Sequence, residues 1–293
     1  MTETSPGPRG LDHLVIGVSD LDAAGALYER LGFRVGARNR HPWGTENRIV
    51  QFPGSFLELI TIGDATAIPA HEARRFSFGA FVRDALARCE GMSMLVLESS
   101  DSDADAAAFQ AAGIGDFEPF FFERQAKRPD GSEVRVAFSL AFAEDRAAPD
   151  CGFFVCQQHE PQNFWNPAFQ QHENGAQALS AVAFVADDPA RHERFFSAYT
   201  ACASFATAGG GLRFALPRGR IEVMSTQAAA AALGDASTRR ARPHFAGFAV
   251  AVPALSPVEE RLRGHGIACR REGGRLVVPP AAALGCAIVF EQG

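Results

Sequence analysis

Two side chains that are common metal ligands, His13 and Glu58, lie in apolar segments typical of β-strands. Because successive strand side chains point to opposite faces of a sheet, His13 is expected on the face away from Leu14 and Ile16. Glu58 lies within the sequence FLELIT, where burial of a carboxylate is costly unless something pairs with it. A divalent ion shared by both residues would supply that partner, since imidazole and carboxylate both suit Zn, Mn, Ni or Fe(II).

The segment that holds these residues, residues 11–61, reads as one β-α-β-β-β module. A strand that carries His13 leads to Ser19 and Asp20, good N-cap residues whose side-chain oxygens accept first-turn N–H groups. The following helix is expected to end at Gly32, because glycine adopts the left-handed conformation at low cost. Three strand-like runs follow, and the last contains Glu58.

Four further residues follow in the turn-rich sequence HPWGTEN. Such a loop or strand rim is a place where side chains can converge on a substrate. We therefore treat as candidate substrate-binding residues His41, Trp43, Thr45 and Asn47. A purely structural role, in which the Asn and Thr side chains stabilise a turn, accounts for these residue types equally well.

The sequence GFFVCQQH ends in two more candidates, Gln157 and His159. His159 is a candidate third metal ligand or proton carrier. Gln157 is a candidate substrate-binding residue.

A strand histidine, a helix that ends in LGF and a last strand with LELI together resemble the vicinal oxygen chelate superfamily, the glyoxalase-like group. The segments HPWGTEN, CQQH and FWNPAFQ are similar to those of glyoxalase-like domain proteins of about this length. The resemblance implies that two modules form a cupped sheet. It also implies that metal ligands come from the first and last strands of each module, here His13 and Glu58.

The βαβββ pattern recurs along the chain, in residues 91–159, 177–225 and 244–293. We predict an α+β fold of four tandem modules paired into two cupped mixed β-sheet domains, residues 11–160 and 177–293. Residues 1–10 are expected to be a flexible N-terminus, residues 161–176 a loop between the domains, and residues 226–243 a linker. Asp130 and Gly131 form a turn signal between two strands of the second module.

The second module lacks the ligands that the resemblance implies. Alignment places Ser93 or Met94 opposite His13, and neither Ser nor Met is a good ligand for a hard divalent ion. Cys156 or Gln157 falls opposite Glu58. Any metal would therefore depend on His13, Glu58 and a third group such as His159 or Gln157.

The third module has a glutamate at the position of Glu58 but no histidine at the position of His13. Glu222 in RIEVMS corresponds to Glu58, but the matching first strand offers only Ser180. We therefore expect Glu222 to be a surface or hydrogen-bonded residue, and the C-terminal pair of modules to be scaffold.

Composition excludes several classes of function. A net charge of −6 and a pI near 5.8 over 293 residues argue against nucleic-acid binding, which needs a basic surface. No signal peptide or long apolar span is found, so a cytoplasmic protein that does not bind membranes is expected. The six cysteines form no CxxC pair, and neither a P-loop nor a GxSxG motif is present.

Three functions, each with a small-molecule ligand, remain open, and so does the question of whether the protein is an enzyme. The first is a metal-dependent lyase or isomerase, similar to lactoylglutathione lyase, in which His13, Glu58 and His159 hold a divalent ion. The ion would chelate vicinal oxygens and stabilise an enolate, and Glu58, His41 or His159 would move the proton. The second is a metal-free binding protein, and the third is an Fe(II) extradiol-type dioxygenase. A homodimer is a further expectation.

Overall fold

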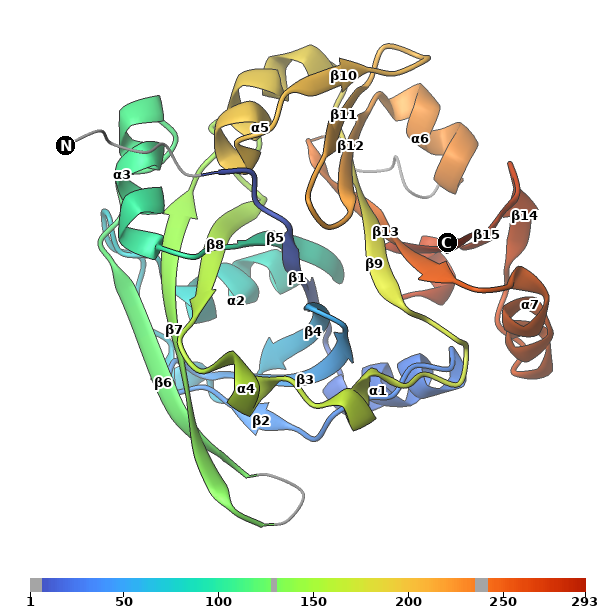
Figure 1. Cartoon of the computed structure of the whole chain (residues 1–293), viewed down its shortest axis with the longest axis horizontal. Coiled ribbons are helices and arrows are strands. Elements are labelled where there is room, and N and C mark those ends of the chain that lie inside the picture. The colour runs from blue at the N-terminus through green and yellow to red at the C-terminus, as the bar shows by residue number, and fades with distance from the viewer. Residues whose placement is uncertain (1–6, 128–130, 235–241) are drawn as a thin grey trace.

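The computed structural model describes residues 7–127, 131–234 and 242–293. Their strands form two eight-stranded mixed sheets, each built from two βαβββ modules (Figure 1). The predicted α+β fold of paired cupped sheets is confirmed.

The first sheet is made by the N-terminal half of the chain. Its strands are β1 (Leu11–Gly17), β2 (Asn39–Arg40), β3 (Thr45–Phe52), β4 (Ser55–Ile62), β5 (Gly91–Glu98), β6 (Phe120–Lys127), β7 (Glu133–Ala143) and β8 (Gly152–Gln158). They lie in the order β2-β3-β4-β1-β5-β8-β7-β6. The first strands of the two modules, β1 and β5, pair antiparallel at the centre, and each pairs parallel with the last strand of its own module.

The second sheet repeats this arrangement. Its strands are β9 (Ala178–Val185), β10 (Ser204–Ala206), β11 (Leu212–Ala215), β12 (Arg220–Met224), β13 (His244–Val252), β14 (Arg270–Glu272), β15 (Arg275–Val278) and β16 (Ala287–Gln292). Their order, β10-β11-β12-β9-β13-β16-β15-β14, matches that of the first sheet position by position.

One helix follows the first strand of each module, and two more connect modules. The four module helices are α1 (Leu21–Arg30), α3 (Ser102–Ala112), α5 (Glu193–Thr200) and α7 (Leu255–Gly264). The connecting helices are α2 (Phe78–Arg88) and α6 (Thr226–Leu233). The crossing from one sheet to the other contains the short α4 (Pro161–Phe164), and single 3-10 turns are η1 (Ala65–Ala67), η2 (Pro167–Gln170), η3 (Pro189–His192) and η5 (Pro280–Ala282).

Local signals set the ends of the first helix. The Asp20 carboxylate accepts hydrogen bonds from the backbone N–H groups of Asp22 and Ala23, as expected for an N-cap. Gly32, just past the C-cap, has a φ of +92°. The second module uses the same two devices, with Asp101 as the N-cap of α3 and Gly113 at a φ of +70°.

The two sheets share one apolar core. Side chains from one face of each sheet, including Leu57 and Phe153 of the first and Phe184 and Phe290 of the second, are fully or almost fully buried together with residues of the module helices. Each opposite face belongs to a separate buried cluster of its own. We call these opposite faces the first cup and the second cup. Because the faces that carry the core turn toward each other, the two cups face outward.

Both connecting helices lie on the cup side of a sheet. Phe78 and Val82 of α2 pack in the first cup, and Ala229 and Leu233 of α6 pack in the second. The prediction of a linker at residues 226–243 is wrong for α6, because this alanine-rich segment has high helix propensity and an N-cap at Ser225. Residues 235–241 of that linker lie outside the described residues, and so does Asp130 of the predicted turn.

The first described residues of the chain are held against the folded protein by Arg9. Residues 1–6 of the expected flexible N-terminus lie outside the described residues, but Arg9 is only 4% exposed. Its guanidinium pairs with Asp105 of α3 and donates to the Tyr199 carbonyl at 2.8 Å. None of the helices in the described residues is long and apolar enough to cross a membrane.

Two buried tyrosines offer a matched test of this core. The Tyr199 hydroxyl on α5 lies 2.7 Å from the carbonyl oxygens of both Leu95 and Phe154 in the first sheet, whereas the Tyr28 hydroxyl has no partner among the described residues. We expect Tyr199→Phe to lower the free energy of unfolding by about 1–2 kcal/mol, because a satisfied buried hydrogen bond is lost. Tyr28→Phe should leave it unchanged or raise it, because an unpaired polar group is removed. Urea denaturation of both variants measures the difference, and equal effects would contradict the assignment.

Candidate functional site

The first cup holds a small cavity walled mainly by aromatic rings. Its volume is about 90 Å³, and the side chains around it come from β1, β3 to β8, α2, α4 and the loop before β3. The rings stack or meet edge to face, as Trp43 does with Phe78 at 5.4 Å and with Phe122 at 4.8 Å between centroids. A few polar groups lie among these rings, and they are the candidate groups for binding a ligand or transferring a proton.

His13 lines this cavity and is held by a neighbouring carboxylate. The β1–β5 register shifts between Leu11 and His13, and an irregularity of this kind re-aims side chains, so that Asp12 and His13 contact each other although they are adjacent in the strand. His13 Nδ1 lies 2.5 Å from Asp12 Oδ1, and Gln158 donates to the other Asp12 oxygen at 3.0 Å. A carboxylate can only accept, so Nδ1 carries a proton, and the tautomer of the neutral ring has its lone pair on Nε2.

The His13 ring is fixed by stacking as well. It is parallel to the Phe56 ring with centroids 4.2 Å apart, and it is only 5% exposed. An imidazole whose tautomer and orientation are both set is suited to act as a general base or as a ligand.

Glu58 lines the same cavity and belongs to a hydrogen-bonded chain. The Asn47 side-chain amide donates to Glu58 Oε1 at 2.5 Å and reaches His41 Nε2 at 3.4 Å. His41 Nδ1 in turn lies 2.8 Å from the Thr45 hydroxyl oxygen, within hydrogen-bonding distance. The structure thus brings together five of the residues predicted from the sequence, since Trp43 stacks on His41 with centroids 4.7 Å apart. Thr45 contacts His41 without lining the cavity itself.

Two hydrogen-bond donors of the cavity wall lack strong partners. The indole N–H of Trp43 is buried and has no acceptor among the residues that the structure describes. The Arg124 guanidinium has one hydrogen bond there, a long contact of 3.5 Å to the Gln125 carbonyl. The indole N–H is thus a buried donor without an acceptor, which is rare, whereas the Arg124 guanidinium is half-buried. Both can donate to an acceptor that enters the cavity.

Burial dominates the electrostatics of the site. It lowers the pKa of His41, with a smaller upward effect from Glu58 and a smaller downward effect from Arg124. Burial likewise lowers the pKa of Arg124, against the attraction of Glu58. It raises the pKa of Cys156 well above the usual thiol value, and Asp12 and Glu58 add to that shift. At neutral pH, His41 is therefore neutral and Cys156 is a thiol.

Two predicted residues lie elsewhere. His159 Nε2 lies 2.8 Å from the Ser139 hydroxyl on the exposed side of the β7–β8 pair. Gln157 caps α3, accepting from the Ser102 N–H at 3.1 Å and donating to the Ser100 carbonyl at 2.9 Å. Neither residue lines the cavity, because strand alternation at the end of β8 turns Cys156 inward and Gln157 away.

Several residues of the site were missed by sequence reasoning. Phe120, Phe122 and Arg124 alternate along β6 and line the cavity together. This period of two was visible in FFFER, but the face that it turns inward depends on the register with β7. Asp12 had no signal, since only the irregular β1–β5 pairing brings it onto His13.

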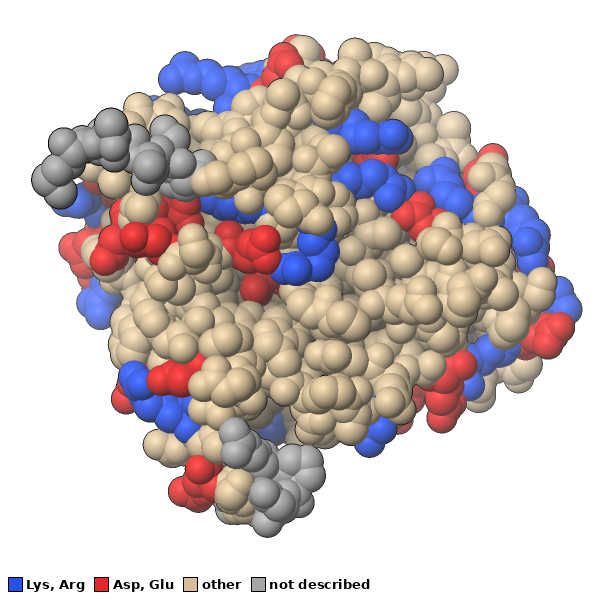
Figure 2. Space-filling model, viewed as in Figure 1, with Lys and Arg blue, Asp and Glu red and all other residues tan. Residues whose placement is uncertain are grey.

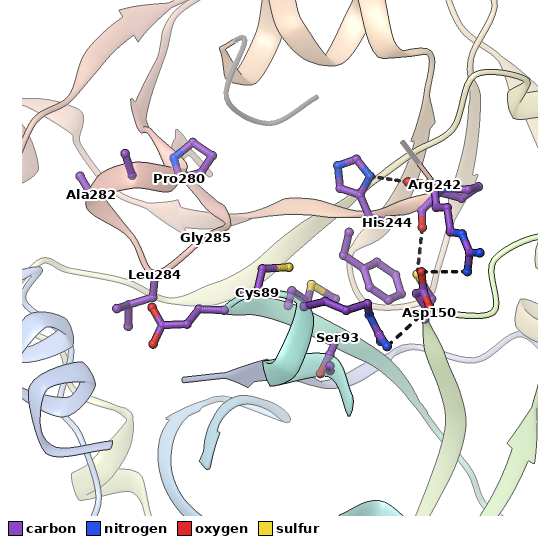
Figure 3. Close-up of a pocket in the computed structure, with 18 of the residues that line it drawn as sticks. Cys89, Ser93, Asp150, Arg242, His244, Pro280, Ala282, Leu284 and Gly285 are labelled. Carbon is purple, nitrogen blue, oxygen red and sulfur yellow. Dashed lines mark hydrogen bonds and ion pairs between the residues drawn. The ribbon is translucent and has the colours of Figure 1, made fainter. Parts of the chain in front are cut away.

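A larger groove lies between the two halves of the molecule and holds none of the predicted site residues. Its volume is about 1150 Å³. Figure 3 shows Cys89, Ser93 and Asp150 of the first half facing His244, Pro280 and Leu284 of the second. Asp150 is paired with Arg88 at 3.7 Å and with Arg242 at 3.5 Å. The Asp150 carboxylate is thus already paired. We place the candidate site in the first cup, which holds most of the predicted site residues.

Comparison with known proteins identifies the family of this chain. Residues 11–200, more than half of the chain, match the family model described as a glyoxalase-like domain. The chain belongs to the glyoxalase-like domain family. The matched region contains the whole first cup. A search of proteins with curated descriptions found no match.

Solved structures share the fold at low sequence identity. A hypothetical protein from Staphylococcus aureus superimposes with a TM-score of 0.69 at 10% identity, covering 97% of this chain and 100% of that one. A mutant of 4-hydroxymandelate synthase from Streptomyces coelicolor gives 0.57 at 12% identity, covering 98% and 94%. The Mn(II)-bound glyoxalase from Novosphingobium aromaticivorans gives 0.57 at 13% identity, covering 97% and 82%.

The donor set of this glyoxalase-like domain does not form a complete divalent centre. Of the residues aligned with ligand positions in the second module, the structure turns Met94 and Cys156 into the cavity, beside His13 and Glu58. A thioether and a protonated thiol are poor ligands for a hard divalent ion. Within the described residues, no group of three or more His, Cys, Asp or Glu side chains is arranged to hold a metal. Metal binding therefore stays a prediction, and we derive no step through a metal.

The pKa of His41 provides a test of the electrostatics. We expect NMR titration to give a value below the ordinary 6.5. Arg124→Gln should raise this pKa, because a nearby positive charge is removed, and Glu58→Gln should lower it, because a nearby negative charge is removed. Shifts of the same sign in both variants would show that a change of structure, rather than charge, is being measured.

Proposed function

We propose that the first cup binds a small molecule that has an apolar body and a carboxylate or similar oxyanion, without requiring a metal. The observation that carries this proposal is the pair of poorly satisfied donors, Trp43 N–H and the Arg124 guanidinium, in a cavity walled mainly by aromatic rings. A guanidinium makes strong charge-assisted hydrogen bonds to a carboxylate, and they strengthen further away from water. The aromatic rings would hold the apolar body.

The cavity volume limits the size of the ligand. At about 90 Å³ it is smaller than a cavity of about 150 Å³ that holds benzene. A ligand of a few carbon atoms fits this space, whereas a ring-sized ligand has to displace side chains of the wall. The names of two structural neighbours, a glyoxalase and 4-hydroxymandelate synthase, support a small oxygenated ligand.

Tryptophan fluorescence tests this proposal. The chain has two tryptophans, Trp43 in the cavity wall and Trp165 outside it. In a Trp165→Phe background, the emission of Trp43 should change saturably with carboxylates in a series from propionate to benzoate, and less with the matching amides. Arg124→Gln should raise the dissociation constant at least about tenfold, as loss of a charged hydrogen bond predicts.

The matched control is Arg135→Gln. Arg135 lies on the adjacent strand β7, is exposed and pairs with Glu123 and Glu160, so its loss should leave carboxylate binding unchanged. Amides that bind as tightly as carboxylates, or equal effects of the two arginine variants, would refute the proposed oxyanion site.

A second candidate function is favoured by the Asp12–His13 pair. The lyase or isomerase chemistry predicted from the sequence needs a base that removes a proton next to a carbonyl. His13, with its Nδ1 proton held by Asp12, presents Nε2 for that role. Dioxygenase chemistry would need a third ligand beside His13 and Glu58, and we do not propose it.

Hydrogen–deuterium exchange of the methyl group of pyruvate tests this candidate. If His13 is the base, the protein should accelerate exchange in D₂O, EDTA treatment should not remove the effect, and His13→Gln should reduce the rate by about 10²- to 10⁴-fold. Loss of exchange with EDTA and its recovery with Mn(II) would instead support the metal-dependent lyase. Exchange no faster than in buffer would leave the cup as a binding site only.

A further inference from the structure

The second cup contains a cavity that no sequence pattern predicted. Its volume is about 290 Å³, three times that of the first cup. The difference comes from side-chain size, because the buried cluster of the second cup is mostly small residues such as Ala181, Ala183 and Ala249, whereas that of the first includes several Phe rings. Helix α6 covers part of the cavity through Ala228 and Ala232. Figure 2 shows basic and acidic side chains gathered around a hollow over this part of the second sheet.

The polar groups of this cavity form an ion-pair network. Arg220 makes two parallel contacts with the Glu291 carboxylate, at 2.8 and 2.9 Å, and a third with Glu222 at 2.9 Å. Arg213 also donates to Glu222, at 3.0 Å. The expectation that Glu222 is hydrogen-bonded is confirmed. All four residues lie on strands whose alternate side chains enter the shared core, so alternation alone directs their charges into the cup.

A third arginine adds charge that the network does not balance. Arg275 begins β15 and lines the cavity, on the same face as the buried Val277. Its guanidinium has no hydrogen bond or ion pair within residues 7–127, 131–234 and 242–293. Three arginines, Arg213, Arg220 and Arg275, therefore face two carboxylates.

The Glu291 carboxylate stays ionised near neutral pH and so continues to balance one of these arginines. The pKa of Glu291 is lowered, chiefly by its hydrogen bonds with Arg220 and in part by the charge of Arg275. The pKa of Arg220 is raised by the same pair. One positive charge thus remains on the half-buried Arg275 at the cavity wall, where it can pair with an anion that enters.

We propose that the second cup is a binding site for a small organic carboxylate, whose charge pairs with Arg275 and whose apolar body lies against Ala181, Met224 and Val289. The apolar wall favours an organic acid over a bare inorganic anion, because it has no polar groups to replace the hydration of a fully charged ligand. This site is separate from the first cup and does not depend on the function proposed there.

Methionine methyl groups can report on the two cups independently. The chain has four methionines. Met94 lines the first cup, Met224 lines the second, and Met92 lines the groove between the two halves. In protein labelled with ¹³C at the methionine methyl groups, titration with benzoate should move the Met224 resonance saturably. The Met94 resonance reports on the first cup in the same sample, so absence of benzoate binding in one cup can be distinguished from absence of binding in the other.

Variants and probes make the test specific. Arg275→Gln should raise the half-saturating benzoate concentration at Met224 at least about tenfold, because a charged hydrogen bond is lost. The control Arg271→Gln removes an exposed arginine that pairs with Glu259 and should have no effect. Unchanged Met92 and Met94 resonances in the free variants would verify folding.

Three results would overturn the proposal. They are a Met224 resonance that does not move with benzoate, equal binding of neutral benzyl alcohol, and tighter binding of inorganic phosphate than of benzoate.

Discussion

The arrangement of this protein depends on one apolar core shared by two sheets. Alternate side chains of both sheets enter that core, and the burial of so much apolar surface is the main source of free energy that holds the halves together. Most of the strand residues between those core residues face a cup instead. The same constraint that stabilises the molecule thereby presents two curved surfaces on its outer sides, one for each pair of modules (Figure 1).

The two cups show how one fold can present different chemistry. In the first, aromatic rings leave about 90 Å³ and surround His13, Glu58 and Arg124. In the second, small side chains leave about 290 Å³ beside an arginine–glutamate network. The strand order and pairing are the same in both, so the contrast comes from side chains alone. Fold likeness to a glyoxalase and to 4-hydroxymandelate synthase therefore cannot assign an activity to either cup.

Polar groups of the first cup are held by their neighbours rather than by solvent. Asp12 orients His13, and Asn47 links Glu58 to His41. Such links fix tautomers and orientations before a ligand arrives, which reduces the reorganisation needed on binding or reaction. The exceptions are Trp43 and Arg124, whose donors remain poorly satisfied within the described residues. We regard these exceptions as the strongest indication of what the cavity binds.

By itself the sequence determined the repeated modules, the α+β class and the face on which His13 and Glu58 lie, because helix caps and strand periodicity are local properties. It also pointed to His41, Trp43 and Asn47, which follow one another in a single segment. Only the tertiary structure decided which residues of different strands meet. The register of β6 with β7 turned Arg124 toward the cavity, and an irregularity in the pairing of β1 brought Asp12 to His13. Alternation at the end of β8 turned Gln157 away from the cup, and His159 lies outside the cup beside Ser139. Register depends on pairing between segments far apart in the chain, and a shift of one residue reverses every side chain, so no local pattern could have fixed it.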